Sequence, residues 1–77
     1  MKINVLLFGI LADAVKQSVI EMENIHDTDS LRENIKEMNA TFRDVKFVIA
    51  VNKKIVAGNQ PVNENDEVAL LPPFAGG

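Results

Sequence analysis

The chain contains 77 residues, of which 47% are hydrophobic and 25% are charged, and its formal net charge at pH 7 is −3. One small domain of this size buries only about 60% of its exposable surface, which leaves little room for a catalytic cleft of its own. The negative charge argues against nucleic acid or an anionic membrane as the partner, because both bind basic surfaces. The absence of cysteine excludes disulfides, thiolate zinc sites and cysteine nucleophiles.

The first predicted element is a strand over residues 2–8, KINVLLF. Ile3 and Val5 alternate with polar neighbours and the segment then becomes apolar on both faces, which is typical of a strand in the middle of a sheet. A secretory signal is the alternative interpretation, but Asn4 interrupts the segment and a single lysine precedes the apolar run. We therefore expect a strand, and with it a cytoplasmic protein.

Two less regular segments follow the first strand. Residues 9–15 are expected to form a short helical turn. Residues 17–23, QSVIEME, are expected to form a second, more exposed strand, whose limits the pattern leaves open.

One longer helix is predicted to begin near Ser30. Ser30 and Glu33 have the spacing of a capping box, and residues 27–29 offer alternative caps. His26 with its acidic neighbours has the composition of a metal site, but polar residues ahead of a helix more often serve as caps and loop. Apolar residues recur at helical spacing and form one stripe: Leu31, Ile35, Met38 and Phe42.

Three strands are predicted after the helix, over residues 46–52, 53–56 and 67–71. Asn65 is expected to adopt the left-handed conformation of a tight turn. The first and last strands are the most apolar, so we expect them side by side and parallel in the sheet, with the helix as a right-handed crossover. This predicts an α+β fold, a mixed sheet of about four to five strands covered by one main helix. The predicted core combines Leu31, Ile35, Met38, Ile3, Val5, Val68 and Leu70.

Residues 72–77, PPFAGG, form a tail after the last predicted strand. Pro72 and Pro73 lack backbone N–H groups, so the sheet ladder stops and an extended polyproline geometry is favoured. An extended chain of this length reaches about 20 Å. Gly76 and Gly77 lack Cβ atoms, so they fit a channel too narrow for other residues and deliver the Gly77 α-carboxylate into a partner's active site. A frayed terminus without function is the alternative.

The Gly77 carboxylate is a poor electrophile while it is ionised. It becomes reactive when an ATP-dependent enzyme converts it to an acyl-adenylate. A sulfur donor that displaces the adenylate leaves a thiocarboxylate, whereas an amine gives an amide. A chain without cysteine can therefore carry sulfur on its own terminus.

The segment DEVALLPPFAGG, residues 66–77, resembles the C-terminus of the small subunit of molybdopterin synthase, a sulfur-carrier family with a ubiquitin-like β-grasp fold. IAVN at residues 49–52 and VLLF at residues 5–8 resemble two further family segments. Asn65 stands where the family usually has glycine, and residues 9–23 match poorly.

The resemblance implies a β-grasp domain over residues 1–71 and a protruding tail over residues 72–77. It implies that a ubiquitin-activating-type enzyme uses ATP to adenylate Gly77, which is then converted to a thiocarboxylate. Gly76 is the second site residue implied for this reaction. The large synthase subunit, in a heterotetramer, then receives the sulfur for cyclic pyranopterin monophosphate. This chain binds no cofactor or metal of its own in that scheme. Partner contacts are implied for Phe8, Pro72, Pro73, Phe74 and Ala75.

Three other functions remain open at this point. A sulfur carrier for thiamine synthesis shares the fold and the two terminal glycines. A ubiquitin-like modifier would use the same adenylate to join substrate lysines. A passive β-grasp interaction module would need no chemistry at Gly77. For Phe74, packing back onto the domain is the alternative to anchoring the tail in a partner, and we favour the anchor because buried aromatic residues dominate interfaces.

Overall fold

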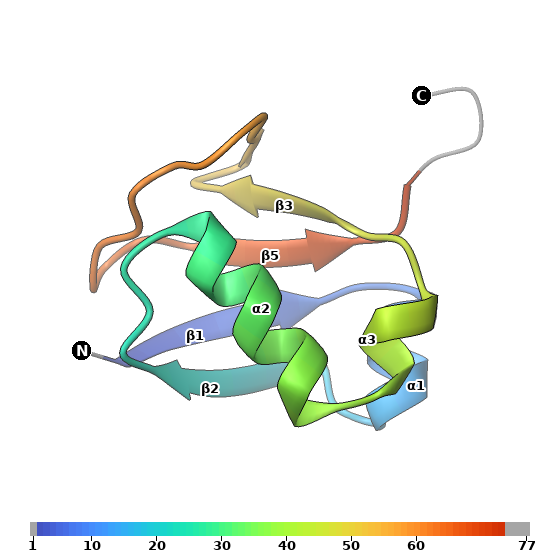
Figure 1. The fold of residues 1–77 in the computed structure, drawn as a ribbon. Helices are drawn as coiled ribbons and strands as arrows, with labels where there is room; N and C mark the ends of the chain where they lie inside the picture. The colour runs from blue at the N-terminus through green and yellow to red at the C-terminus, as the bar shows by residue number, and fades with distance from the viewer. Residues whose placement is uncertain (1, 74–77) are drawn as a thin grey trace.

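The computed structural model describes residues 2–73 (Figure 1). Its elements follow the predicted order, with one additional short helix. They are β1 (Lys2–Leu7), α1 (Ile10–Val15), β2 (Val19–Glu23), α2 (Thr28–Met38), α3 (Thr41–Asp44), β3 (Val48–Val51), β4 (Lys54–Ile55) and β5 (Val68–Leu71).

The strands form one mixed sheet in the order β2-β1-β5-β3-β4. β1 and β5 lie side by side and parallel, with Val5 opposite Val68 and Leu7 opposite Leu70, and the other pairs are antiparallel. Helix α2 lies across one face of the sheet and connects its two halves (Figure 1). The predicted α+β class and the predicted pairing of the first and last strands are confirmed.

The core lies between α2 and the sheet. The predicted members that are buried are Ile3, Val5, Leu31, Ile35, Val68 and Leu70. The prediction that Met38 belongs to the core is wrong, since 58% of this residue is exposed. It is the last residue of α2 and lies at the rim of a cleft of about 180 Å³ rather than under the helix. Phe42, only 1% exposed, packs into the core instead.

The predicted helical stripe is divided between two helices. Asn39 ends α2 in an extended conformation, with φ −149°. Its side-chain oxygen accepts a hydrogen bond at 2.9 Å from the backbone N–H of Thr41, the first residue of the short helix α3. Phe42 therefore reaches the core from α3. Hydrogen bonds from side chains to nearby backbone groups compete in this way with continuation of a helix.

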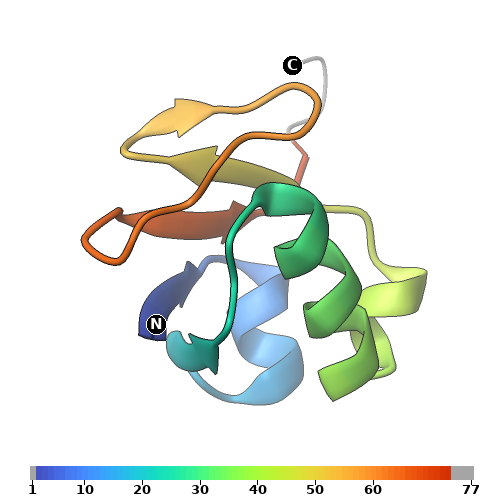
Figure 2. The ribbon, with the colours of Figure 1, turned by 60° about the vertical axis from the view of Figure 1, so that its left-hand side comes forward.

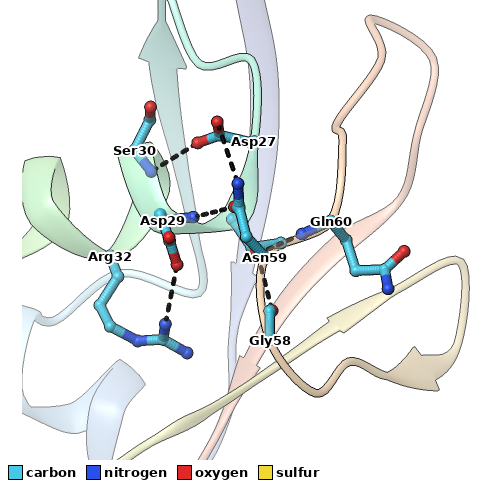
Figure 3. Close-up of polar contacts among 8 residues, drawn as sticks. Asp27, Asp29, Ser30, Arg32, Gly58, Asn59 and Gln60 are labelled. Carbon is cyan, nitrogen blue, oxygen red and sulfur yellow. Dashed lines mark hydrogen bonds and ion pairs between the residues drawn. The ribbon is translucent and has the colours of Figure 1, made fainter.

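Helix α2 begins two residues before the predicted start. Asp27 is the N-cap, and its carboxylate accepts a hydrogen bond from the backbone N–H of Ser30 at 2.7 Å. Asp27 was among the alternative caps, and the predicted capping box at Ser30 is wrong. Thr28 is fully buried as the first helical residue, and its hydroxyl oxygen accepts the N–H of Gln60 at 3.0 Å. This contact ties the loop before β5 to the start of α2 (Figure 3).

The turns around β3, β4 and β5 differ from the prediction. Asn65 is not among the residues with positive φ, whereas Asn52 (51°) and Lys53 (70°) both are, as a two-residue hairpin between β3 and β4 requires. The turn before β5 is fixed instead by Asp66, whose carboxylate accepts hydrogen bonds from the Asn63 N–H at 2.8 Å and the Asn52 amide at 3.0 Å. Side-chain bonds thus replace the left-handed residue that we expected.

Candidate functional site

The site begins where the central strand β5 ends. Leu71 is its last residue and pairs with Val48 of β3. On the other side the N–H of Phe8 donates to the carbonyl of Leu70 at 3.2 Å, which is the last bond between the β1 segment and β5. Pro72 and Pro73 follow outside the strand and have no N–H to offer. The sheet therefore fixes the chain on both sides as far as the end of β5 at Leu71. Pro72 and Pro73 follow directly, and we call them the root of the tail.

Gly9 packs directly against this root. It has a φ of +57°, and a Cβ built on it would lie 3.2 Å from the Cγ of Pro72. Any side chain at position 9 would thus meet both backbone strain and a close contact with the proline ring. The sequence reasoning did not single out Gly9, although a glycine directly after a strand is a recognisable signal of a special backbone conformation.

The face of the sheet that the helices leave uncovered is apolar near the root of the tail. All three helices of residues 2–73 lie on one side of the sheet (Figure 2). Strand alternation and the observed register place one set of apolar residues on the opposite side. We call this set the apolar sheet face: Leu6, Phe8, Val19, Val48, Ala50, Ile55, Ala69 and Leu71.

The apolar sheet face has a polar boundary at its far end. Lys2 pairs with Glu21 at 3.7 Å and with Glu23 at 3.6 Å, on exposed side chains that carry little stability. Phe8 and Val19 are each 45% exposed at the opposite end, where β1 finishes and β2 begins. An exposed apolar area bordered by charge is typical of a protein interaction surface.

The structure places three of the predicted site residues. Phe8 is exposed on the apolar sheet face, Pro72 is half-buried against Gly9, and Pro73 is exposed. Phe8 and the two prolines thus belong to one end of the sheet. The other predicted residues, Phe74, Ala75, Gly76 and Gly77, lie outside the described residues.

Asp27, which the sequence had offered as either a cap or a metal ligand, acts as a cap. The backbone and side chain of Ser30, and then the Asn59 amide, donate hydrogen bonds that hold the pKa of Asp27 below its ordinary value. Asn59 also accepts the N–H of Asp29 at 2.9 Å (Figure 3). The Asp27 carboxylate and the Asp29 backbone N–H are therefore engaged in fixing the start of α2. None of the helices in residues 2–73 is long and apolar enough to span a bilayer.

Comparison with known proteins assigns the family. The model of the ThiS family matches residues 5–77, which include the whole tail. This chain belongs to the ThiS family. Over an alignment 82 positions long, the chain is also 30% identical to the molybdopterin synthase sulfur carrier subunit of Mycobacterium tuberculosis, with 100% of this chain and 99% of the relative covered.

Solved structures agree with this assignment. A chain in the complex of subunits 1 and 2 of the molybdopterin-converting factor of Helicobacter pylori is 27% identical, with both chains fully covered and a TM-score of 0.70. A Pyrococcus furiosus protein described as a candidate molybdopterin converting factor subunit 1 has a TM-score of 0.83 at 23% identity, covering 96% of this chain and 99% of that one. The predicted resemblance to the small synthase subunit and the ubiquitin-like β-grasp fold are confirmed.

Proposed function

We propose that this chain is the sulfur carrier subunit of a molybdopterin synthase. The observation that carries the proposal is the tail: PPFAGG follows directly from the central strand of a ThiS-family β-grasp domain. The similarity to a relative named for this role supports it over the full length of the chain. The chain itself is a non-catalytic carrier, and the catalytic side chains belong to its partners.

The first chemical step is activation of the terminus. The carboxylate of Gly77 attacks the α-phosphate of ATP in a ubiquitin-activating-type enzyme, so that pyrophosphate leaves and an acyl-adenylate forms. Sulfide from a sulfur donor then attacks the acyl carbon and loses its proton, and AMP departs with its bonding electrons. The product is a thiocarboxylate on Gly77. ATP is consumed by the activating enzyme, and this chain holds no cofactor.

The second step is transfer of the sulfur in the large subunit. The tail enters that subunit, and the thiocarboxylate sulfur attacks a side-chain carbon of cyclic pyranopterin monophosphate, so that a C–S bond forms while a C–O bond to that carbon breaks and the oxygen leaves with the bonding electrons. Water then cleaves the acyl–sulfur bond, which leaves the sulfur on the pterin and restores the Gly77 carboxylate. A dithiolene contains two sulfur atoms, so two loaded carriers are consumed for each pterin. Gly76 keeps the channel passable because it has no side chain.

Docking on the large subunit uses the apolar sheet face together with the tail. Phe8 and Pro73 mark the end of this surface, and Phe74 is proposed as the anchor that follows it. The Helicobacter pylori complex of two subunits supports a large-subunit partner. We propose a heterotetramer around a central dimer of the large chain, in the cytoplasm.

Intact mass spectrometry tests the proposed loading step. The chain is incubated with its adenylating enzyme, ATP and a sulfide source, and the product should gain the mass difference between sulfur and oxygen. Omission of ATP is the control and should leave the mass unchanged. Isopeptide-linked products with added proteins would indicate a modifier instead. A loaded chain that supports formation of the thiazole of thiamine, but not conversion of the pterin, would indicate a carrier for thiamine synthesis. A chain whose mass does not change when ATP is present would indicate a passive module.

A further inference from the structure

A groove of about 470 Å³ opens beside the root of the tail. It is bounded by the exposed side of α2, by α3, by the connection from α3 to β3, and by Pro73. The end of β5 and the α3–β3 connection lie next to each other in Figure 1. The groove has apolar walls from Val45, Phe47 and Pro73.

The charge of this groove is opposite to that of the whole chain. Its basic lining residues are Arg32, Lys36, Arg43 and Lys46. Asp44 is the single acidic residue among the lining residues, so the groove has a formal charge of +3. The chain has eight basic and eleven acidic residues, so the remainder holds four and ten and carries −6. We call this surface the basic groove.

Among residues 2–73, three of the four cations have no carboxylate partner. Arg32 lies 3.7 Å from the Asp29 carboxylate. Within residues 2–73, no carboxylate oxygen lies within 4.0 Å of the charged nitrogens of Lys36, Arg43 or Lys46. Their charge is therefore available to a binding partner.

The basic groove is also preorganised. The Nε–H of Arg43 donates to the backbone carbonyl of Lys36 at 3.2 Å, which joins α3 to the last turns of α2. Phe42 is buried beneath, and its ring meets that of Phe47 edge-to-face, with centroids 5.9 Å apart and an interplanar angle of 85°. A surface held in this way loses little conformational entropy on binding.

We propose that the basic groove receives an acidic segment of the protein that takes up the tail. This inference rests on the proposed function, because any protein that encloses residues 74–77 must come close to Pro73, and hence to the groove. Carboxylates of that segment pair with Lys36, Arg43 and Lys46, and an apolar side chain packs on Phe47. Opposite charge beside the tail orients the encounter and speeds association.

The test compares two double charge reversals in the full chain. The groove variant is Arg43→Glu with Lys46→Glu, and the matched control is Lys53→Glu with Lys54→Glu, which changes the net charge equally on the distant β3–β4 hairpin. Affinity for the adenylating enzyme and for the large subunit is measured by calorimetry at low and high salt. For at least one of these proteins, the groove variant should lose affinity about tenfold more than the control at low salt, and the difference should shrink at high salt.

A second variant keeps the Arg43 link to α2. Lys36→Glu with Lys46→Glu should show the same salt-dependent loss, while thermal melting shows that all variants are folded. An equal loss in groove and control variants for both proteins would mean that only net charge matters, and would overturn the proposal.

A peptide probe separates failure of this inference from failure of the proposed function. If wild-type chain is neither loaded nor bound by the two proteins, the proposed function fails. The groove is then judged by NMR titration of the isotopically labelled chain with a short acidic peptide that has a central Leu-Phe pair. The proposal is supported if backbone N–H chemical shifts change only at groove residues. These changes should be absent in the groove variant and with a control peptide in which Asn and Gln replace Asp and Glu. No such shifts, or an equal affinity for inorganic tripolyphosphate, would overturn it.

Discussion

Replacement of Gly9 distinguishes two effects: the loss of stability caused by backbone strain, and the effect of the position of Pro72 on sulfur loading. Its φ of +57° is shared in sign by Gly58 at +74°, but only Gly9 has Pro72 within reach of an added Cβ. Both Gly→Ala changes should therefore lower the free energy of unfolding by about 1–3 kcal/mol, because alanine is strained at a positive φ. Urea unfolding of the two variants measures this common effect.

Of the two substitutions, only Gly9→Ala should change the rate of sulfur loading. In Gly9→Ala the Pro72 ring must shift by a few tenths of an ångström, since the contact is 3.2 Å. We expect a lower kcat/KM for loading in Gly9→Ala, measured with the adenylating enzyme, and an unchanged value in Gly58→Ala. The same loss in both variants would show that Gly9 contributes stability only.

Asp27 gives the helix a pH-dependent cap. Its folded-state pKa lies below the ordinary value because hydrogen bonds from Ser30 favour the carboxylate. A lowered folded pKa adds stability above the unfolded pKa, about 3.8–3.9, and this stability is lost as pH falls through the folded value. Asp27→Asn keeps an acceptor for the Ser30 N–H without the titration.

The stability difference between wild type and Asp27→Asn should therefore favour wild type near neutral pH and diminish in the acid range below about pH 4. Urea unfolding at a series of pH values measures it. A difference that stays constant down to pH 2 would show that the carboxylate charge is not involved.

At the scale of the elements, Phe42 and Met38 test how the helical stripe is divided. Phe42 is 1% exposed and Met38 58% exposed. Phe42→Ala should cost about 3–5 kcal/mol of unfolding free energy, whereas Met38→Ala should stay within about 0.5 kcal/mol. Chemical denaturation of both variants measures the difference, and a similar cost for both would contradict the observed division into α2 and α3.

The apolar sheet face should dominate docking to the large subunit. Phe8→Asp places a charge at its exposed end and should weaken binding by about 2 kcal/mol or more, with the fold retained. Met38→Glu is the control, since this exposed apolar residue lies on the helix side. We expect the same loss for Phe74→Asp. Calorimetry with the large subunit measures all three, and an equal affinity of Phe8→Asp and wild type would contradict this surface.

The arrangement of the strands could be predicted because their patterns were unambiguous. The apolar runs of β1 and β5 indicated central strands, and their parallel pairing followed from the handedness of a crossover. The limits of the helices could not be read in the same way. Asp27, Ser30 and Asn39 are all good caps in the sequence, and only the tertiary contact between Thr28 and Gln60 decides where α2 begins.

At the scale of the whole molecule, the candidate site divides into a part written in the sequence and a part made by folding. The tail is a linear segment, so PPFAGG could be recognised without a structure. Gly9 meets Pro72 only through a contact between distant segments, and Arg43 reaches the Lys36 carbonyl only across the break between α2 and α3. The basic groove was missed because its four cations, within residues 32–46, are interspersed with acidic residues, and the sequence alone does not show that they share one surface.

For the whole molecule, we propose that the folded domain presents the C-terminus to the partner proteins and that this terminus carries the sulfur. Deletion of Gly77 shortens the extended reach by about 3.5 Å, whereas productive geometry tolerates about 1 Å. Folding should be unchanged because the residue lies beyond β5. Binding to the large subunit should largely persist because the apolar sheet face remains. Gly76→Val should fail in a similar way, because its branched side chain blocks the channel.

The most direct test is pterin conversion by the large subunit with wild-type or Gly77-deleted carrier. Each carrier is first incubated with adenylating enzyme, ATP and a sulfur donor, and thermal melting and calorimetry establish that both are folded and bound. We expect wild-type carrier to support dithiolene formation and the shortened carrier to support none. Conversion of the pterin by the shortened carrier would show that sulfur reaches the pterin without the Gly77 terminus, and would overturn the proposed function.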